Sequence, residues 1–192
     1  MKRSLKRRHA SGLVALIIGL GLLLAQHYGW TKAPAQVLEK SQPGLYSVVH
    51  FDDGDTIDVN MNGTREKIRF IGVDTPETHD PRKAVQCFGQ AAASFTKQLI
   101  GSNSVRLESD PLSSNRDRYN RLLRYIYLPN GTLVNLEIIK QGYGFAYTSF
   151  PFTKSDQFLA AQTTARQQNR GLWHNCQPTK NQYGGYTSNN AN

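Results

Sequence analysis

Two runs rich in β-branched and aromatic residues, joined by a short acidic turn, most constrain how this chain can fold. They cover residues 45–51 and 56–61 and flank residues 52–55, which read Asp-Asp-Gly-Asp. Asp-Gly and Asn-Gly pairs favour tight turns between strands, and an Asn-Gly pair stands at 62–63. A third run, residues 67–73, ends at an Asp-Thr-Pro sequence. The pattern predicts three consecutive strands of a meander.

The remaining elements follow from hydrophobic periodicity. Residues 86–100 have helical spacing, and residues 104–108 and 122–128 resemble strands. Two further helices are expected at 134–141 and 155–169, each followed closely by a glycine. Five short strands with a helix between the third and the fourth indicate an α+β fold, mainly β: a five-stranded Greek-key barrel of the OB type with three helices. Such barrels bind oligonucleotides, but a fold alone does not assign an activity.

Charge and composition divide the chain into three parts. The formal net charge is +9, but six of the 23 basic residues precede residue 36 and no acidic residue does, so the rest carries only +3. We expect a hydrophobic signal or anchor segment at 1–35 and one barrel domain at 43–176. The segment 177–192 is rich in Asn, Gly, Tyr and Ser and lacks an apolar face, which predicts a disordered tail.

The N-terminal segment has the layout of an export signal. A basic stretch, residues 1–8, precedes an apolar run, residues 13–25, which is shorter than the roughly 20 residues of a comfortable membrane span. Cleavage after 33–35 (Ala-Pro-Ala) would release the protein, whereas an uncleaved segment extended through Trp30 would be an anchor in the membrane. Both alternatives place the remainder outside the cytoplasm, either secreted or periplasmic or tethered to the membrane.

The chain has two cysteines, Cys87 and Cys176. An even number in an exported protein permits one disulfide closing a long loop, and the alternative is two unpaired buried thiols. These two residues and His174 do not have the spacing of a zinc site.

Charged residues cluster around the end of the third predicted strand. Residues 69–77 read Arg-Phe-Ile-Gly-Val-Asp-Thr-Pro-Glu, and the acidic turn 52–55 and residues 117–121 (Asp-Arg-Tyr-Asn-Arg) lie on either side in the sequence. Three acids and two arginines could therefore meet at one metal ion and one phosphate. Each has a plainer alternative, because Asp-Gly is common hairpin chemistry and Arg121 could be an edge charge on a strand.

Taken together and in this order, these motifs resemble the thermonuclease family, typified by staphylococcal nuclease. The resemblance rests on residues 53–56, on Arg69 with 73–77, on 117–121, and on the Gly-Leu-Trp sequence 171–173. It runs from about residue 46 to residue 173 and covers the whole predicted barrel with its helices.

The resemblance implies a calcium site. Asp55, Asp74 and the backbone carbonyl of Thr75 match the family's calcium ligands, and calcium prefers such oxygen donors. Two carboxylates and water would also suit magnesium or manganese. Asp53 is expected to orient these ligands without binding the metal directly.

The resemblance also implies a reaction. Glu77 matches the general base that activates the attacking water, and Arg69 and Arg121 match the pair that holds the phosphate. The implied activity is endonucleolytic hydrolysis of DNA and RNA to 3′-phosphate products. The alternative is a non-catalytic OB-fold protein of the cell envelope that binds nucleic acid, with or without a membrane anchor.

Further residues match the family less closely. Tyr119 and Tyr147 lie where the family keeps tyrosines near the nucleotide, and core packing is the alternative for Tyr147. Exported bacterial relatives with similarly placed cysteines imply a disulfide between Cys87 and Cys176. A monomer is the default expectation.

Overall fold

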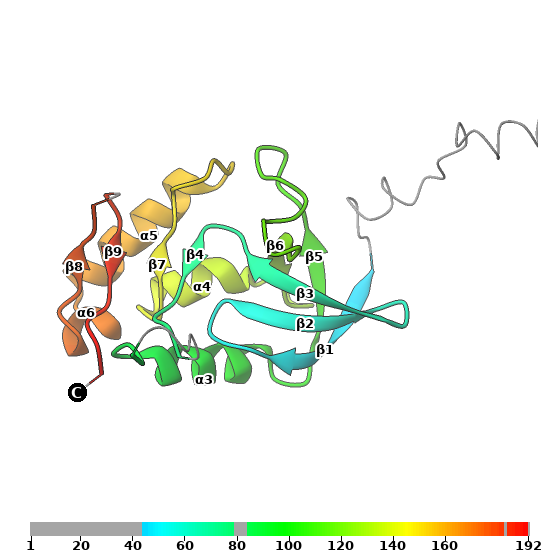
Figure 1. Cartoon of the computed structure of the whole chain (residues 1–192), viewed down its shortest axis with the longest axis horizontal. Coiled ribbons are helices and arrows are strands. Elements are labelled where there is room, and N and C mark those ends of the chain that lie inside the picture. Colours follow the sequence, from blue (N-terminus) through cyan, green and yellow to red (C-terminus); the bar gives the residue numbers. More distant parts are fainter. Residues whose placement is uncertain (1–43, 79–83, 183, 192) are drawn as a thin grey trace, which may run out of the picture. The chain divides into compact units, whose positions relative to one another are not determined.

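Five strands close into a barrel in the computed structural model (Figure 1). The strands, in chain order, are β1 (Leu45–Phe51), β2 (Thr56–Met61), β3 (Thr64–Phe70), β5 (Ser104–Glu108) and β6 (Leu122–Tyr127). Around the barrel they follow the order β1-β2-β3-β6-β5, and β5 pairs back onto β1. The β3–β6 pair is parallel and the other pairs are antiparallel. The expected five-stranded barrel is confirmed.

The structure describes residues 44–78, 84–182 and 184–191, all within the unit Lys40–Asn192. The expected signal or anchor segment lies outside these residues. None of the helices described is both long and apolar enough to cross a membrane.

Alternating side chains fill the barrel. Ile57 and Val59 on β2 are fully buried, as are Ile68 on β3 and Leu122 on β6. Ile57 faces Ile68 across the antiparallel β2–β3 pair, and Ile68 faces Leu122 across the parallel pair. The hydrophobic side of each strand therefore determines the register, because a slip by one residue would turn these side chains to solvent.

The third predicted strand is divided in the structure. β3 ends at Phe70, and the chain turns at Gly72, whose φ is 71°. A Cβ at Gly72 would lie 2.6 Å from the Phe152 ring, so glycine is needed for space as well as for backbone conformation. The short strand β4 (Val73–Asp74) then leaves the barrel and pairs with β7 (Phe145–Ala146). This turn carries Asp74 away from the barrel wall.

Three helices of seven to thirteen residues accompany these strands, as expected, and a helix of four residues follows them. They are α3 (Gly89–Ile100), α4 (Val134–Lys140), α5 (Ser155–Gln167) and the short α6 (Leu172–Asn175). α3 and the segment after α4 are joined by stacking of Phe95 on Tyr143, with ring centroids 4.0 Å apart. The buried Asn135 of α4 donates to the carbonyl of Ile71 and accepts from the amide of Ile126, which fixes α4 against the turn before β4.

The tail differs from the expected disorder. Its described part forms two short antiparallel strands, β8 (Thr179–Lys180) and β9 (Tyr186–Thr187), which lie beside α5 and α6 (Figure 1). The Tyr186 ring packs edge-on against Trp173 at a centroid distance of 4.9 Å, and Phe145 lies 6.2 Å away. The average composition of this segment does not reveal that Tyr186 packs against Trp173. The folded part of the chain extends beyond the expected boundary at residue 176.

Cys87 and Cys176 form a disulfide. It connects the residue two positions before α3 to the residue directly after α6. Cys176 is buried beside Leu172 and Trp173 in a small apolar cluster.

Candidate active site

The turn between β1 and β2 fixes Asp55 by hydrogen bonds. Asp55 is only 4% exposed, and its Oδ2 accepts from the Thr75 amide at 2.8 Å and from Thr75 Oγ1 at 3.1 Å. Asp53 Oδ1 accepts from the Asp55 amide at 2.9 Å, which is the expected hairpin chemistry. The Asp-Gly-Asp sequence is therefore both a turn and a support for the Asp74-Thr75 segment.

Helix α3 holds this turn from the other side. Thr96 Oγ1, fully buried, donates to the Gly54 carbonyl at 2.7 Å. A Cβ at Gly54 would lie 2.8 Å from Thr75 Cγ2 and 3.0 Å from the Cβ of Ala92, so only glycine lets the turn approach both neighbours.

Arg69 joins the two acidic segments. Its Nη1 lies 2.5 Å from Asp55 Oδ1, and its Nη2 lies 3.1 Å from Asp74 Oδ1. Burial disfavours the charged guanidinium, but Asp55, Asp74 and Asp53 outweigh this effect and raise the pKa of Arg69 above its usual value. Arg69 thus remains a cation between carboxylates.

Acidic side chains are concentrated at this point. Burial and the neighbouring Asp55 carboxylate raise the pKa of Asp53 to about 8. Asp55 and Asp74 contact the Arg69 guanidinium directly, whereas Asp53 contacts the backbone of Asp55.

Glu77 and Arg121 line a cleft next to this cluster. The cleft has a volume of about 560 Å³, and its other lining residues are His50, Phe51, Asp52, Asp53, Thr56 and Lys67. Asp53 lines the cleft and accepts a hydrogen bond from the Asp55 amide, so the carboxylate cluster and the cleft are adjacent. Glu77 comes directly after Pro76 at the end of the segment that follows β4, and its Oε1 accepts from the Thr78 amide at 2.9 Å.

Arg121, immediately before β6, is held by Asp117. Both Nε and Nη2 of Arg121 lie 2.7 Å from Asp117 Oδ2, and Asp117 Oδ1 accepts from the amides of Arg121 and Tyr119. Burial opposes ionisation of Asp117, but these bonds outweigh it and lower its pKa. Arg121 is therefore a fixed cation at the edge of the cleft.

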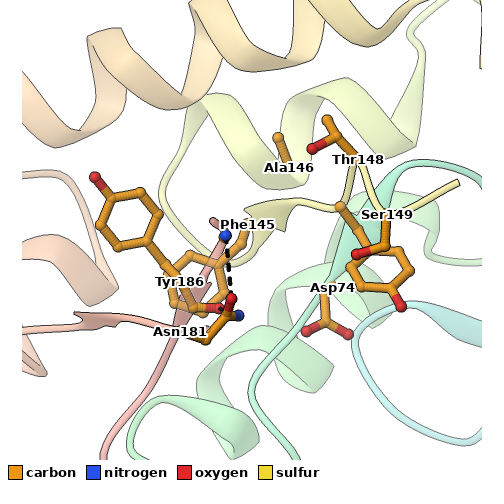
Figure 2. Close-up of a pocket in the computed structure, with 9 residues that line it drawn as sticks. Asp74, Phe145, Ala146, Thr148, Ser149, Asn181 and Tyr186 are labelled. Carbon is orange, nitrogen blue, oxygen red and sulfur yellow. Dashed lines mark hydrogen bonds between the residues drawn. The ribbon is translucent and has the colours of Figure 1, made fainter. Parts of the chain in front are cut away.

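The two tyrosines lie at different places. Tyr119 is 60% exposed, and the guanidinium of Arg121 lies 5.4 Å from its ring centroid. Tyr147, which is 38% exposed, lines a separate pocket of about 60 Å³ together with Asp74. Figure 2 shows Asp74, Ser149 and the tail residue Asn181 around this pocket. Tyr119 therefore lies beside Arg121 and Tyr147 beside Asp74, so each ring is next to one part of the candidate site.

Lys67 also lines the cleft, although the sequence motifs did not predict it. It lies on β3, two residues before Arg69, and strand periodicity places both side chains on one face. Its Nζ contacts the carboxylates of Asp52 and Asp58. The sequence contains one indication of this residue: Lys67 is basic and stands two positions before Arg69.

The donor atoms of the site residues suit a hard cation. Asp55, Asp74 and the carbonyl of Thr75 are oxygen donors, and the cluster has more carboxylates than cations. In the described part of the chain, however, no three His, Cys, Asp or Glu side chains are grouped in a way that could hold a metal ion on their own. A cation here would depend on backbone oxygen and water as well as on two aspartates.

Comparison with known proteins agrees with this arrangement. Residues 67–175 match the model of the staphylococcal nuclease homologue family. The chain is 35% identical over 164 residues to the thermonuclease of Staphylococcus hyicus, covering 85% of this chain and 94% of that protein. It is 33% identical over 172 residues to the thermonuclease of Staphylococcus intermedius, covering 87% and 98%.

A third relative is similar over a shorter region. Endonuclease YncB of Bacillus subtilis is 39% identical over 123 residues, which is 63% of this chain and 57% of that protein. With the barrel, the acidic cluster and the arginine-lined cleft in place, the chain belongs to the staphylococcal nuclease family and is a nuclease, a hydrolase of phosphodiester bonds in nucleic acid.

Proposed function

We propose that this nuclease depends on calcium and cuts DNA and RNA internally, leaving 3′-phosphate ends. The observation that carries the proposal is the position of Glu77 and Arg121 in one cleft, next to the carboxylates of Asp55 and Asp74 that contact Arg69. A carboxylate base, two guanidinium groups and an oxygen-donor cation site together can carry out phosphodiester hydrolysis.

Each residue has a specific part in the reaction. Glu77 takes a proton from water while the water oxygen bonds to phosphorus. Arg121, oriented by Asp117, and Arg69 donate to the equatorial phosphoryl oxygens, whose negative charge grows in the transition state. A 3′-phosphate results when the bond between phosphorus and the 5′ oxygen breaks and that oxygen takes a proton from solvent.

Asp55, Asp74 and the Thr75 carbonyl would hold the calcium ion. When bound, the ion supplies positive charge that polarises the phosphoryl oxygens. Asp53 orients Asp55 through the backbone of the turn, since its Oδ1 accepts from the Asp55 amide. Arg69 is paired with Asp55 and Asp74 in the structure, and the five donors of a guanidinium allow it to serve carboxylate and phosphate together.

The disulfide supports the proposal that the protein is exported. Structural disulfides form and persist in oxidising compartments. The bond between Cys87 and Cys176 is consistent with a periplasmic, secreted or externally tethered nuclease.

The test is degradation of a supercoiled plasmid and of a structureless RNA by the purified protein, with calcium and with chelator. We expect Glu77→Gln to lower kcat by at least about 100-fold, because the amide keeps the shape of the side chain but cannot accept the proton. Glu108→Gln is the matched control, because Glu108 lies on β5, is paired with Arg106 and does not line the cleft.

The product ends provide a second measurement. A 3′-phosphate prevents extension by a polymerase until a phosphatase removes it. Cutting that persists in chelator would contradict calcium dependence, and full activity of Glu77→Gln would contradict the role of the base. Retardation of the plasmid without cutting would indicate a nucleic-acid-binding protein.

A further inference from the structure

The backbone of Glu77 is held by one residue of a different segment. The Glu77 amide donates to Gln86 Oε1 at 2.8 Å, and the Glu77 carbonyl accepts from the Gln86 amide at 2.9 Å. Gln86 thus satisfies both backbone polar groups of Glu77, once with its side chain and once with its main chain.

The beginning of α3 reinforces this contact. A Cβ at Gly89 would lie 2.8 Å from the Glu77 carbonyl oxygen and 2.8 Å from Thr78 Cγ2, so the helix approaches this segment as closely as a glycine permits. The Gly89 amide donates to the Gln86 carbonyl, which fixes Gln86 to the first turn of the helix.

The C-terminal tail pairs with the segment that contains Gln86. The Cys87 amide donates to the Asn189 carbonyl at 2.7 Å, and the Ala191 amide donates to the Val85 carbonyl at 2.8 Å. Gln86 itself forms an antiparallel bridge with Asn190. Residues 188–191 therefore run antiparallel to residues 85–87 and are joined to them by one β-bridge at Gln86, and we call this segment the tail strand.

Side chains and the disulfide fix the tail strand. Ser188, only 4% exposed, donates from Oγ to the Cys87 carbonyl at 2.8 Å. Asn189 Nδ2 donates to the Cys176 carbonyl at 3.1 Å. Because Cys87 is bonded to Cys176, the tail, the end of α6 and the start of α3 meet next to Gln86.

We propose that Gln86 is a positioning residue for the general base Glu77, and that the tail strand 188–191 keeps Gln86 in place. This inference rests on the proposed role of Glu77. Its physical reason is that a proton acceptor acts only within a narrow range of positions, and a small displacement of the base lowers the rate without weakening substrate binding. The tail then contributes to catalysis without contacting the nucleic acid.

The first experiment removes the acceptor oxygen of Gln86. Gln86→Met has nearly the same length but cannot accept from the Glu77 amide, and we expect kcat to fall about 10-fold or more with KM changed less than about twofold. Gln86→Glu retains an acceptor oxygen and is expected to recover kcat to within about threefold. Gln90→Met is the matched control, because Gln90 is exposed on the first turn of α3.

A second readout does not depend on activity. Hydrogen exchange of the Glu77 amide, followed by NMR, is expected to be at least about 10-fold faster in Gln86→Met and in a chain that ends at Thr187, but unchanged in Gln90→Met. The shortened chain keeps both cysteines and the β8–β9 pair, and thermal unfolding shows whether it remains folded.

The outcomes separate the two proposals. If the wild-type protein does not cut, the proposed function fails, and the catalytic role of Gln86 fails with it. If the wild type cuts while Gln86→Met keeps full kcat, or if Gln86→Glu is as slow as Gln86→Met, the nuclease assignment stands and the positioning role is overturned. Unchanged exchange at Glu77 in the shortened chain would overturn the role of the tail.

Discussion

A single glycine sets how closely the catalytic segments can approach one another. Gly54→Ala would place a Cβ 2.8 Å from Thr75 Cγ2, in the segment after β4, and 3.0 Å from the Cβ of Ala92 in α3. We expect the substitution to lower the free energy of unfolding by about 1–3 kcal/mol, the usual cost of overpacking, and to weaken calcium binding. Urea denaturation and calcium titration measure the two effects.

Gly44→Ala is the control for this prediction. There the nearest atom to an added Cβ is 3.4 Å away on the Tyr46 ring, which is ordinary contact, so stability should be nearly unchanged. Equal stability of Gly54→Ala and the wild type would show that the turn can move away from Thr75.

At the scale of residues, the candidate site residues could be predicted from the sequence more fully than their arrangement in space. Asp55, Arg69 and Asp74 lie together, as do Glu77 and Arg121, because the motifs that carry them lie at or close to the ends of strands. The direct pairing of Arg69 with both aspartates was not predicted, because it depends on the turn at Gly72. Residue type alone also could not show that Tyr147 lines a pocket together with Asp74.

At the scale of elements, one covalent bond joins the start of α3 to the end of α6. The disulfide closes a loop with a sequence separation of 89 residues. In the chain-entropy model a loop of this length contributes roughly 4–5 kcal/mol by restricting the unfolded chain. We expect the double variant Cys87→Ser with Cys176→Ser to lose up to this amount in urea denaturation.

Reduction provides the comparison for that variant. Wild-type protein in dithiothreitol should unfold at the same urea concentration as the double variant, because both lack the same bond. A double variant as stable as oxidised wild type would mean that the tail and the apolar cluster around Trp173 hold these elements without it.

Most barrel elements could be predicted because each has its own hydrophobic periodicity and is bounded by residues that favour turns. β1, β2 and β5 have the expected bounds, and α3 begins three residues later than expected because Cys87 is disulfide-bonded and Phe88 adopts a φ of 73°. The tail could not be predicted from local pattern. Its strands are two residues long and are stabilised by distant partners such as Trp173 and Cys87, which only the folded chain brings near.

At the scale of the whole molecule, one buried carboxylate connects the barrel to the C-terminal helices. Asp110, just after β5, is 4% exposed, and its Oδ2 accepts from Tyr125 Oη at 2.7 Å in β6 and from the Thr153 amide at 2.8 Å ahead of α5. Burial opposes its ionisation, but these hydrogen bonds outweigh burial and lower the pKa of Asp110. Its charged form therefore stabilises the folded protein.

The lowered pKa gives a pH dependence with a definite sign. A carboxyl group whose pKa is lower in the folded state than its unfolded value of about 3.9 contributes stability above that pH, and the contribution is lost as the pH falls toward the folded pKa. Asp110→Asn should lower the free energy of unfolding by about 1–3 kcal/mol at pH 7, because an amide accepts fewer of these bonds. The difference from wild type should shrink as the pH falls below about 4, because the unfolded chain then binds a proton at Asp110 more readily than the folded protein does.

The exposed Asp156→Asn on α5 is the control, and it should change the free energy of unfolding by less than about 1 kcal/mol at each pH. A difference between Asp110→Asn and wild type that is the same at pH 7 and pH 3 would show that the shape of Asp110, and not its charge, connects β5 to β6 and α5. A difference that disappears in acid would show that protonation of Asp110 weakens the contacts that connect β5 to β6 and to the start of α5.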